Sequence, residues 1–240
     1  MKIHTFYLKG GLGNQIFQLN KILSLKENFD LDSVIINIGL LDSYSTSREF
    51  ELAKYFDLDK EGIVVNSSPV YFKNIYKVIL RIASNFDIFP VYFSYYQNTI
   101  ISLEEVDKLL YSYQRNIKKT LSDKILIHAR LGDYLQVIPE YRLLLIDFVN
   151  KFTEKYTSDE YLVSTDDIDY FKSDILPFLN ISNVRYFDLD FNNIYTFKCV
   201  FSPNSSYSFW YAAMGRSKLA MPEDDFGFRE YMLQNADLLH

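Results

Sequence analysis

The stretch IHTFYLKGGLGNQIFQLNKIL, residues 3–23, decides the fold class of this chain. An apolar run ends at three closely spaced glycines, and apolar residues then recur near helical spacing between Ile16 and Leu23. The pattern predicts a strand, a glycine turn and a helix, which is how an α/β unit begins.

Strand and helix patterns alternate along the rest of the chain. Apolar or β-branched runs predict strands at residues 34–38, 63–65, 91–95, 125–129, 161–165 and 184–189, and near residue 200. Other patterns predict helices at residues 69–83, from residue 102, at 139–156, at 166–176, through residue 194 and after residue 204. Such alternation is typical of α/β proteins whose parallel sheets are covered on both faces.

The length suits two small α/β domains. We expect an N-terminal domain at residues 1–120 and a C-terminal domain at residues 121–240, with the boundary in the polar stretch 115–124. A ligand would then lie in the cleft between the domains. The last helix is expected to pack back on the N-terminal domain.

Composition narrows the class of protein. The chain has 240 residues, of which 48% are apolar and 23% charged, as in a globular protein. The formal net charge is -6 and no window is strongly basic, so nucleic acid is not an expected partner. The single cysteine rules out an internal disulfide and suits a reducing compartment, and the three histidines lack the spacing of a zinc site.

Membrane contact is an open question at one segment. The sequence has no uncharged apolar run near the ~20 residues that a spanning helix needs, and no signal peptide is expected. PVYFKNIYKVILRIA, residues 69–83, is apolar and basic enough to lie on a membrane surface, and a buried helix is the alternative. We expect a cytoplasmic protein, with peripheral membrane contact through this segment left open.

The glycine stretch fits neither of the two familiar nucleotide loops. Gly11 and Gly13 have the spacing of a dinucleotide-binding loop, but Ile16 stands where the third glycine is needed. A P-loop is excluded because no Lys-Ser or Lys-Thr pair follows the glycines. Two interpretations remain: a tight turn without a ligand, or a helix N-terminus that presents backbone N–H groups, with Asn14 and Gln15, to a polar or anionic ligand.

A second motif, IHARLGDYL at residues 127–135, ends an apolar strand. His128, Arg130 and Asp133 would lie at the carboxyl edge of a parallel sheet, where ligands of open α/β sheets bind. The planar fork of donors on Arg130 matches a diphosphate well. The alternative is a structural ion pair beside a turn.

Two further motifs sit at expected helix starts. In YLVSTDDID, Asp166 and Asp167 could accept hydrogen bonds from a base or a ribose, although helix capping accounts for part of the pattern. In PNSSYSFWYAA, Asn204, Ser205 and Ser206 would place hydroxyl and N–H donors near a phosphate. The aromatic residues that follow, Phe209, Trp210 and Tyr211, are most simply core residues.

A divalent-metal site is a minor alternative, because Asp188 and Asp190 form a pair of carboxylates after an expected strand.

The motifs GGLGNQIFQ, HARLGDY, STDD and NSSYSFWYAA, in this order, resemble those of the glycosyltransferase family 11 α-1,2-fucosyltransferases. REFEL, residues 48–52, is similar to another family segment. The resemblance implies a GT-B-like fold, in which two Rossmann-like domains face each other across a cleft. It implies inverting transfer of L-fucose from GDP-β-L-fucose to the 2-hydroxyl of a galactose-like acceptor, with neither a metal nor another cofactor.

The resemblance also implies roles for the candidate residues. Arg130 would hold the donor diphosphate with His128 beside it, and Asp166, Asp167, Asn204, Ser205 and Ser206 would complete the GDP site. Our own nominee for the catalytic base is Asp133, with ordering of the Arg130 loop as the alternative. We expect the loop of Gly11, Gly13, Asn14 and Gln15 to form the acceptor side of the cleft, where Asn14 and Gln15 would meet the acceptor, the reacting sugar or the diphosphate. The acceptor would be a galactose-containing oligosaccharide or lipid-linked glycan of O-antigen or lipopolysaccharide synthesis, met at the inner face of the bacterial inner membrane.

Two departures from the family pattern keep alternatives open. Leu131 stands where a second arginine often follows, and the segment KCVFSPNSS, residues 198–206, is short and lacks a histidine. The alternatives are a glycosyltransferase with another nucleotide-sugar donor, and a non-catalytic protein of the same fold that binds a sugar nucleotide or a glycan.

Overall fold

The computed structural model describes residues 4–31, 34–41, 48–68, 75, 77–79, 82, 91–92, 101–138, 140–202 and 205–221. The chain divides into two compact units: residues 1–99 with 103–114, and residues 115–240 with 100–102. Each unit holds one sheet, and all strands within each sheet pair in parallel. The prediction of an α/β protein with two parallel sheets is therefore confirmed.

The first unit begins with the strand, turn and helix predicted for residues 3–23. Its sheet has the order β3-β2-β1-β4. The strands are β1 (His4–Tyr7), β2 (Val34–Asn37), β3 (Ile63–Asn66) and β4 (Val91–Tyr92), and the helices are α1 (Leu12–Phe29), the short 3-10 helix η2 (Leu52–Lys54) and α3 (Leu103–Ser112). α1 buries its apolar stripe and ends at Asp30, whose left-handed backbone (φ 49°) lets its N–H reach the last carbonyls of the helix.

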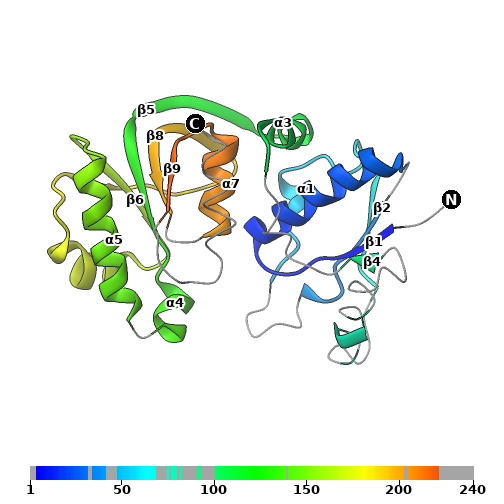
Figure 1. Ribbon diagram of the computed structural model, residues 1–240, viewed down its shortest axis with the longest axis horizontal. Helices are drawn as coiled ribbons and strands as arrows, with labels where there is room; N and C mark the ends of the chain where they lie inside the picture. Colours follow the sequence, from blue (N-terminus) through cyan, green and yellow to red (C-terminus); the bar gives the residue numbers. More distant parts are fainter. Residues whose placement is uncertain are drawn as a thin grey trace. The chain divides into compact units, whose positions relative to one another are not determined.

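The second unit has a five-stranded sheet in the order β7-β6-β5-β8-β9 (Figure 1). Its strands are β5 (Asn116–Ala129), β6 (Tyr161–Thr165), β7 (Val184–Tyr186), β8 (Asn193–Phe201) and β9 (Leu219–Ala220). Its helices are α4 (Gly132–Val137), α5 (Tyr141–Lys155), α6 (Ile168–Tyr170) with the π turn η3 (Phe171–Ile175) and the 3-10 turn η4 (Leu176–Phe178), and α7 (Ser206–Met214). In chain order this sheet reads 3-2-1-4-5, the order of a Rossmann-type sheet.

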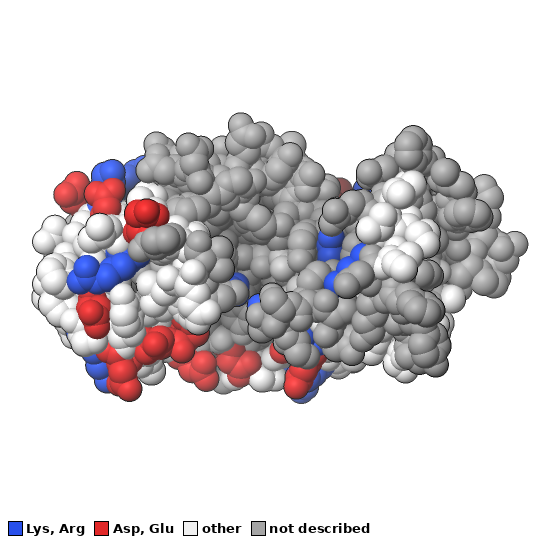
Figure 2. Space-filling view, turned by 90° about the horizontal axis from the view of Figure 1, so that it is seen from below, with Lys and Arg blue, Asp and Glu red and all other residues white. Residues whose placement is uncertain are grey.

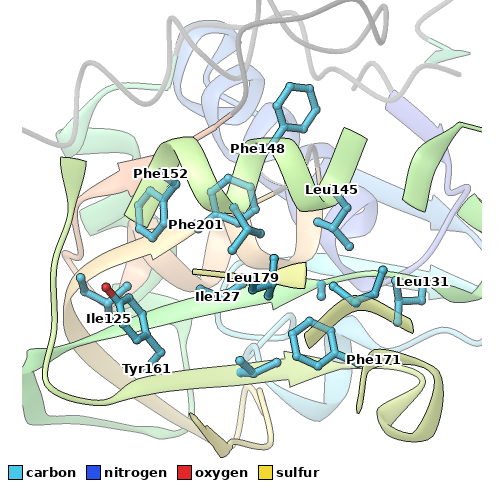
Figure 3. Close-up of a cluster of buried hydrophobic side chains, with 14 of the residues drawn as sticks. Ile125, Ile127, Leu131, Leu145, Phe148, Phe152, Tyr161, Phe171, Leu179 and Phe201 are labelled. Atoms are coloured by element: carbon cyan, nitrogen blue, oxygen red, sulfur yellow. The ribbon is translucent and has the colours of Figure 1, made fainter. Parts of the chain in front are cut away.

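Alternation along β5 explains how this sheet is covered on both faces. Ile125, Ile127 and Ala129 belong to a buried cluster with α5 residues such as Leu145. Figure 3 shows these α5 side chains over the strands together with Phe201 of β8. The intervening His128 faces α7 instead, as its hydrogen bond to Ser208 shows. The two-residue period of the strand thus buries one set of side chains under α5 and turns the other toward α7.

One sequence prediction in the second unit was wrong, and one expected boundary is placed more exactly. The division between the units falls between residues 114 and 115, at the start of the polar stretch in which we expected it, and β5 begins within that stretch at Asn116. Among the described residues, the first half of β5 pairs with β8, and pairing with β6 begins at Ile125, so the first half of β5 lies at an edge of the described sheet and tolerates a polar sequence. The helix expected through residue 194 is replaced by the start of β8.

Other predictions fall partly outside the described residues. Positions 75, 77–79 and 82 of the predicted helix at residues 69–83 are helical, and the other positions lie outside the described part. The helix α7 belongs to the second unit and is followed by β9, a strand of the sheet in that unit.

Among the helices described, none combines the length and apolar character that crossing a bilayer requires. Figure 2 shows acidic and basic side chains interspersed on one face.

Candidate functional site

The order of the second sheet marks one position for a ligand. From β5 the chain proceeds to β6 and β7 on one side, and then returns to β8 and β9 on the other. In open α/β sheets, ligands bind outside the carboxyl ends of the strands where the order reverses, which here is between β5 and β8. The described residues at that point are 130–132 after β5, and 202 and 205–206 after β8. The HARLGDY motif and the described part of the NSSYS motif, residues 205–208, therefore meet at one edge of one sheet.

His128 is anchored by serines of the α7 segment. Its Nδ1 lies 2.9 Å from Ser208 Oγ, and Ser208 Oγ lies 2.7 Å from Ser202 Oγ. The backbone N–H of Ser205 donates to Ser202 Oγ over 3.3 Å. Ser202, Ser205 and Ser208 are buried, and His128 as a residue keeps only a small part of its surface exposed. The imidazole is thus held from its Nδ1 side by a buried polar chain.

The same surroundings keep His128 uncharged. Removal of water by the packed protein lowers the pKa of His128 from its ordinary value of 6.5 to about 4. The Arg130 guanidinium adds to this lowering, while the Asp166 carboxylate opposes it. At neutral pH the ring is therefore a neutral imidazole with one N–H donor and one acceptor nitrogen.

Arg130 follows β5 directly and lies two positions beyond His128 on the strand path. Its guanidinium carbon is 5.0 Å from the centre of the Tyr134 ring, a cation–π distance. Tyr134 belongs to α4, so the ring contact joins the strand end to the next helix. Asp133 lies in α4 as well, and its side chain is outside the described part of the structure.

The two aspartates after β6 have structural roles that differ. Asp166 Oδ1 accepts a hydrogen bond of 2.6 Å from the backbone N–H of Leu131, which ties the end of β6 to the loop after β5. Asp167 caps α6, because its Oδ1 accepts from the Tyr170 N–H over 3.0 Å. Both side chains are exposed. The capping interpretation accounts for Asp167, whereas Asp166 supports the loop immediately after Arg130 through its bond to Leu131.

The N-terminus of α7 carries an unsatisfied buried hydroxyl. Ser205 occupies the N-cap position with an extended backbone, yet its side chain makes no capping hydrogen bond. Within the described residues its Oγ has no hydrogen-bond partner although the side chain is 1% exposed. Ser206 opens the helix and is partly exposed, while Asn204 lies outside the described residues. Phe209, Trp210 and Tyr211 are buried, as their interpretation as core residues predicted.

In the first unit the glycine loop is supported by a buried glutamine. Gln15 Nε2 donates to the carbonyls of Gly10 and Glu49 over 3.0 and 2.7 Å, and Gln15 Oε1 accepts from the Glu51 N–H. The residue is fully buried, and its side chain holds the glycine loop and the REFEL segment together. Gly11 is the N-cap of α1, with the Arg48 guanidinium 4.0 Å from the position of an added Cβ. Within α1, Gly13 is buried and Asn14 is partly exposed.

Asp190, of the proposed metal pair, has local partners. Both of its carboxylate oxygens accept hydrogen bonds from Asn192 Nδ2, and Oδ1 also accepts from the Asn192 N–H. This arrangement is an Asx turn, in which an aspartate side chain bonds to the backbone two residues along. Across the described residues, no three His, Cys, Asp or Glu side chains gather into a candidate metal centre.

Ser202 and Ser208 were not identified from the sequence as partners of His128, nor was the anchoring role of Asp166. Ser202 lies within KCVFSPNSS and Ser208 within PNSSYSFWYAA, but no role in holding His128 was predicted for them. The spacing of Ser205 and Ser208, one helical turn apart at a helix start, was the available signal. Compared with known families, curated proteins and solved structures, the chain matches no family model, no curated protein and no solved structure.

Proposed function

We propose that this protein is an inverting glycosyltransferase that moves L-fucose from GDP-β-L-fucose to the 2-hydroxyl of a galactose-like acceptor. The observation that carries the proposal is the meeting of HARLGDY and NSSYS at the switch point of one Rossmann-type sheet. That edge holds a guanidinium, a neutral imidazole and a helix N-terminus with an unsatisfied buried hydroxyl, all suited to a diphosphate. The choice of GDP-fucose as the donor rests on the resemblance of the four ordered motifs to those of the α-1,2-fucosyltransferases.

The chemistry follows from where charge develops. The acceptor oxygen bonds to the anomeric carbon while the bond from that carbon to the GDP oxygen breaks, and its electron pair leaves with the diphosphate. Arg130 and the N–H groups at the start of α7 stabilise that negative charge without a metal or another cofactor. The acceptor proton passes to a base on the opposite face of the sugar, for which Asp133 is the nominee.

The first unit supplies the acceptor side in this proposal. A GT-B arrangement would set the α1 glycine loop opposite the GDP site, with Gly11, Gly13 and Asn14 toward the acceptor and Gln15 behind them. The acceptor is a galactose-containing oligosaccharide or a lipid-linked glycan of surface-polysaccharide synthesis, and nucleic acid is not a partner. These assignments place the enzyme in the cytoplasm.

Peripheral contact with the inner membrane is part of the same proposal. Ile75, Val78, Ile79 and Ile82 are each more than half exposed and recur at i, i+3, i+4 and i+7. Exposed apolar residues at this spacing suit a helix that lies on a lipid surface. Co-sedimentation with vesicles of anionic phospholipid should fall when Ile75 and Ile79 are both changed to Ser, and binding unchanged by this double substitution would refute the contact.

A second candidate is a protein that binds a sugar nucleotide without turnover. Leu131, where a second arginine often stands in the family, is a fully buried core residue. The strand end thus offers Arg130 as its single guanidinium. A binding protein needs less stabilisation of leaving-group charge than an enzyme does, which is the specific reason to keep this candidate.

A donor screen distinguishes the candidates. GDP-fucose, GDP-mannose and UDP-sugars are each incubated with galactoside acceptors, with and without EDTA, and nucleotide release is measured together with GDP binding by calorimetry. Transfer from GDP-fucose that survives EDTA and is lost in Arg130→Ala supports the enzyme. The matched control is Arg185→Ala, which removes an exposed arginine paired with Glu160. GDP binding without turnover favours the second candidate. Absence of GDP binding refutes the fucosyltransferase, and absence of binding to both GDP and UDP refutes the second candidate as well.

A further inference from the structure

We propose that Ser202 and Ser208 are positioning residues that hold His128 as the Nε2–H tautomer, so that Nε2–H is a hydrogen-bond donor to the donor diphosphate. The inference rests on the proposed function for the identity of the ligand. The tautomer itself rests on the hydrogen-bond geometry alone, and the two parts are tested separately below.

The serine chain has one fixed donor, and the contact distances decide between the two directions that the hydroxyl groups can take. The Ser205 backbone N–H can only donate, and it points to Ser202 Oγ. If each hydroxyl hydrogen passes to the next member, Ser202 donates to Ser208 over 2.7 Å and Ser208 donates to His128 Nδ1 over 2.9 Å. Both hydroxyl hydrogens, of Ser202 and Ser208, are then placed in the two short contacts of 2.7 and 2.9 Å. Hydrogen bonds that run in one direction also polarise, and so strengthen, one another.

The opposite direction of donation leaves one hydroxyl hydrogen with a long hydrogen bond. His128 Nδ1–H would donate to Ser208, and Ser208 to Ser202. The Ser202 hydrogen would then be left with the Ser205 carbonyl at 3.4 Å. If Ser202 donated to Ser208 instead, the Ser208 hydrogen would be left with the same carbonyl at 3.3 Å. Hydrogen bonds between oxygen atoms are normally 2.5–3.0 Å. The geometry therefore favours Nδ1 as the acceptor.

The position of the remaining proton follows from the neutral ring. A neutral imidazole carries one N–H, so when Nδ1 accepts, the hydrogen is on Nε2. Of the described residues, none bonds to Nε2. A phosphate oxygen accepts hydrogen bonds, and an Nε2 lone pair would repel it. The serine chain thus converts His128 from a possible base into a donor directed at an anion, beside Arg130.

The protein has three histidines, which makes a direct test practical. Long-range 1H–15N correlation spectra of the full chain near pH 7 are assigned with His128→Gln. We expect an acceptor-type nitrogen at Nδ1 and a protonated nitrogen at Nε2. A protonated Nδ1 in the wild type overturns the inference, whatever calorimetry then shows for GDP binding.

Variants test the role of the serines. Ser208→Ala and Ser202→Ala should each shift His128 toward a mixture of tautomers and weaken GDP binding about tenfold, the equivalent of one lost hydrogen bond to a charged group. The control Ser173→Ala removes an exposed hydroxyl on η3 and should leave the spectrum unchanged. An unchanged tautomer in both serine variants overturns the inference. If GDP binds without shifting the Nε2 signal, the proposed donor role is wrong, and if GDP does not bind, the proposed function fails as well.

Discussion

The Leu131 N–H donates to Asp166 Oδ1 over 2.6 Å, and this bond fixes the loop that carries Arg130 to the end of the neighbouring strand. Asp166→Ala should therefore accelerate hydrogen exchange at the Leu131 amide and lower the free energy of unfolding by about 0.5–1.5 kcal/mol. Asp169→Ala, an exposed acid three residues along, is the matched control. Equal exchange at Leu131 in all three proteins would contradict an anchoring role.

The buried Ser205 hydroxyl predicts opposite effects on stability and binding. Because its Oγ lacks a partner among the described residues, Ser205→Ala removes a desolvated polar atom and should leave stability unchanged or raise it by up to about 1 kcal/mol. If the hydroxyl serves a phosphate, the same change should weaken GDP binding. Urea denaturation and calorimetry measure the two effects. Destabilisation by more than about 1 kcal/mol would show that the hydroxyl has a structural partner.

Two adjacent glycines should respond differently to alanine. Gly10 has φ 80° and an added Cβ would collide with the Asn14 side chain, so Gly10→Ala should cost about 1–3 kcal/mol of stability. At Gly11 the backbone is ordinary (φ -74°) and the nearest atom to an added Cβ is 4.0 Å away, so Gly11→Ala should change stability by less than about 1 kcal/mol. Urea denaturation of the two variants and the wild type measures their free energies of unfolding. Equal losses of stability in the two variants would contradict the loop geometry.

Patterns local in sequence predicted most of the fold. The strand at residues 161–165 and the glycine turn into α1 followed from apolar runs and periodicity, and both were confirmed. The first half of β5 was missed because its sequence is polar, and its strand conformation comes from pairing with β8, which is distant in sequence. The start of β8 was mistaken for a helix for the same reason. Pairing between distant segments leaves little trace in a single sequence.

The sequence predicted where the candidate site lies in the fold better than it predicted what each of its side chains contacts. The rule that parallel strands deliver groups at their carboxyl ends placed His128 and Arg130 correctly at the sheet edge. It could not show that Gln15 would be buried or that Asp166 would bond to Leu131, because both depend on which loops approach each other. Side-chain partners across loops require the folded structure.

Gln15 should matter for folding more than for ligand binding. Gln15→Ala leaves the Glu51 N–H and two carbonyls without their side-chain partner, so the free energy of unfolding should fall by about 2–4 kcal/mol. Asn14→Ala, one position earlier and partly exposed, should cost less. Chemical denaturation compares the two variants. A cost below about 1 kcal/mol for Gln15→Ala would contradict its role as the support of the glycine loop.

The lowered pKa of His128 predicts how stability depends on pH. Burial holds the folded-state pKa near 4, whereas the unfolded chain binds the proton near 6.5, so between these values the unfolded state carries more protons. The contribution of His128 is fully present above about pH 6.5 and is lost as the pH falls toward 4. Since one pKa unit corresponds to about 1.4 kcal/mol, the loss should be on the order of 2–3 kcal/mol.

The measurement compares unfolding free energies of the wild type and His128→Gln from pH 7 to pH 4. Glutamine does not titrate, so subtracting the two curves removes the carboxylates that both proteins share. The Asp166 carboxylate and the Arg130 guanidinium act on the imidazole in opposite directions, so Asp166→Asn should lower the pKa of His128 further and Arg130→Gln should raise it. A difference curve that stays flat over this range would mean that the ring is not desolvated in the folded protein.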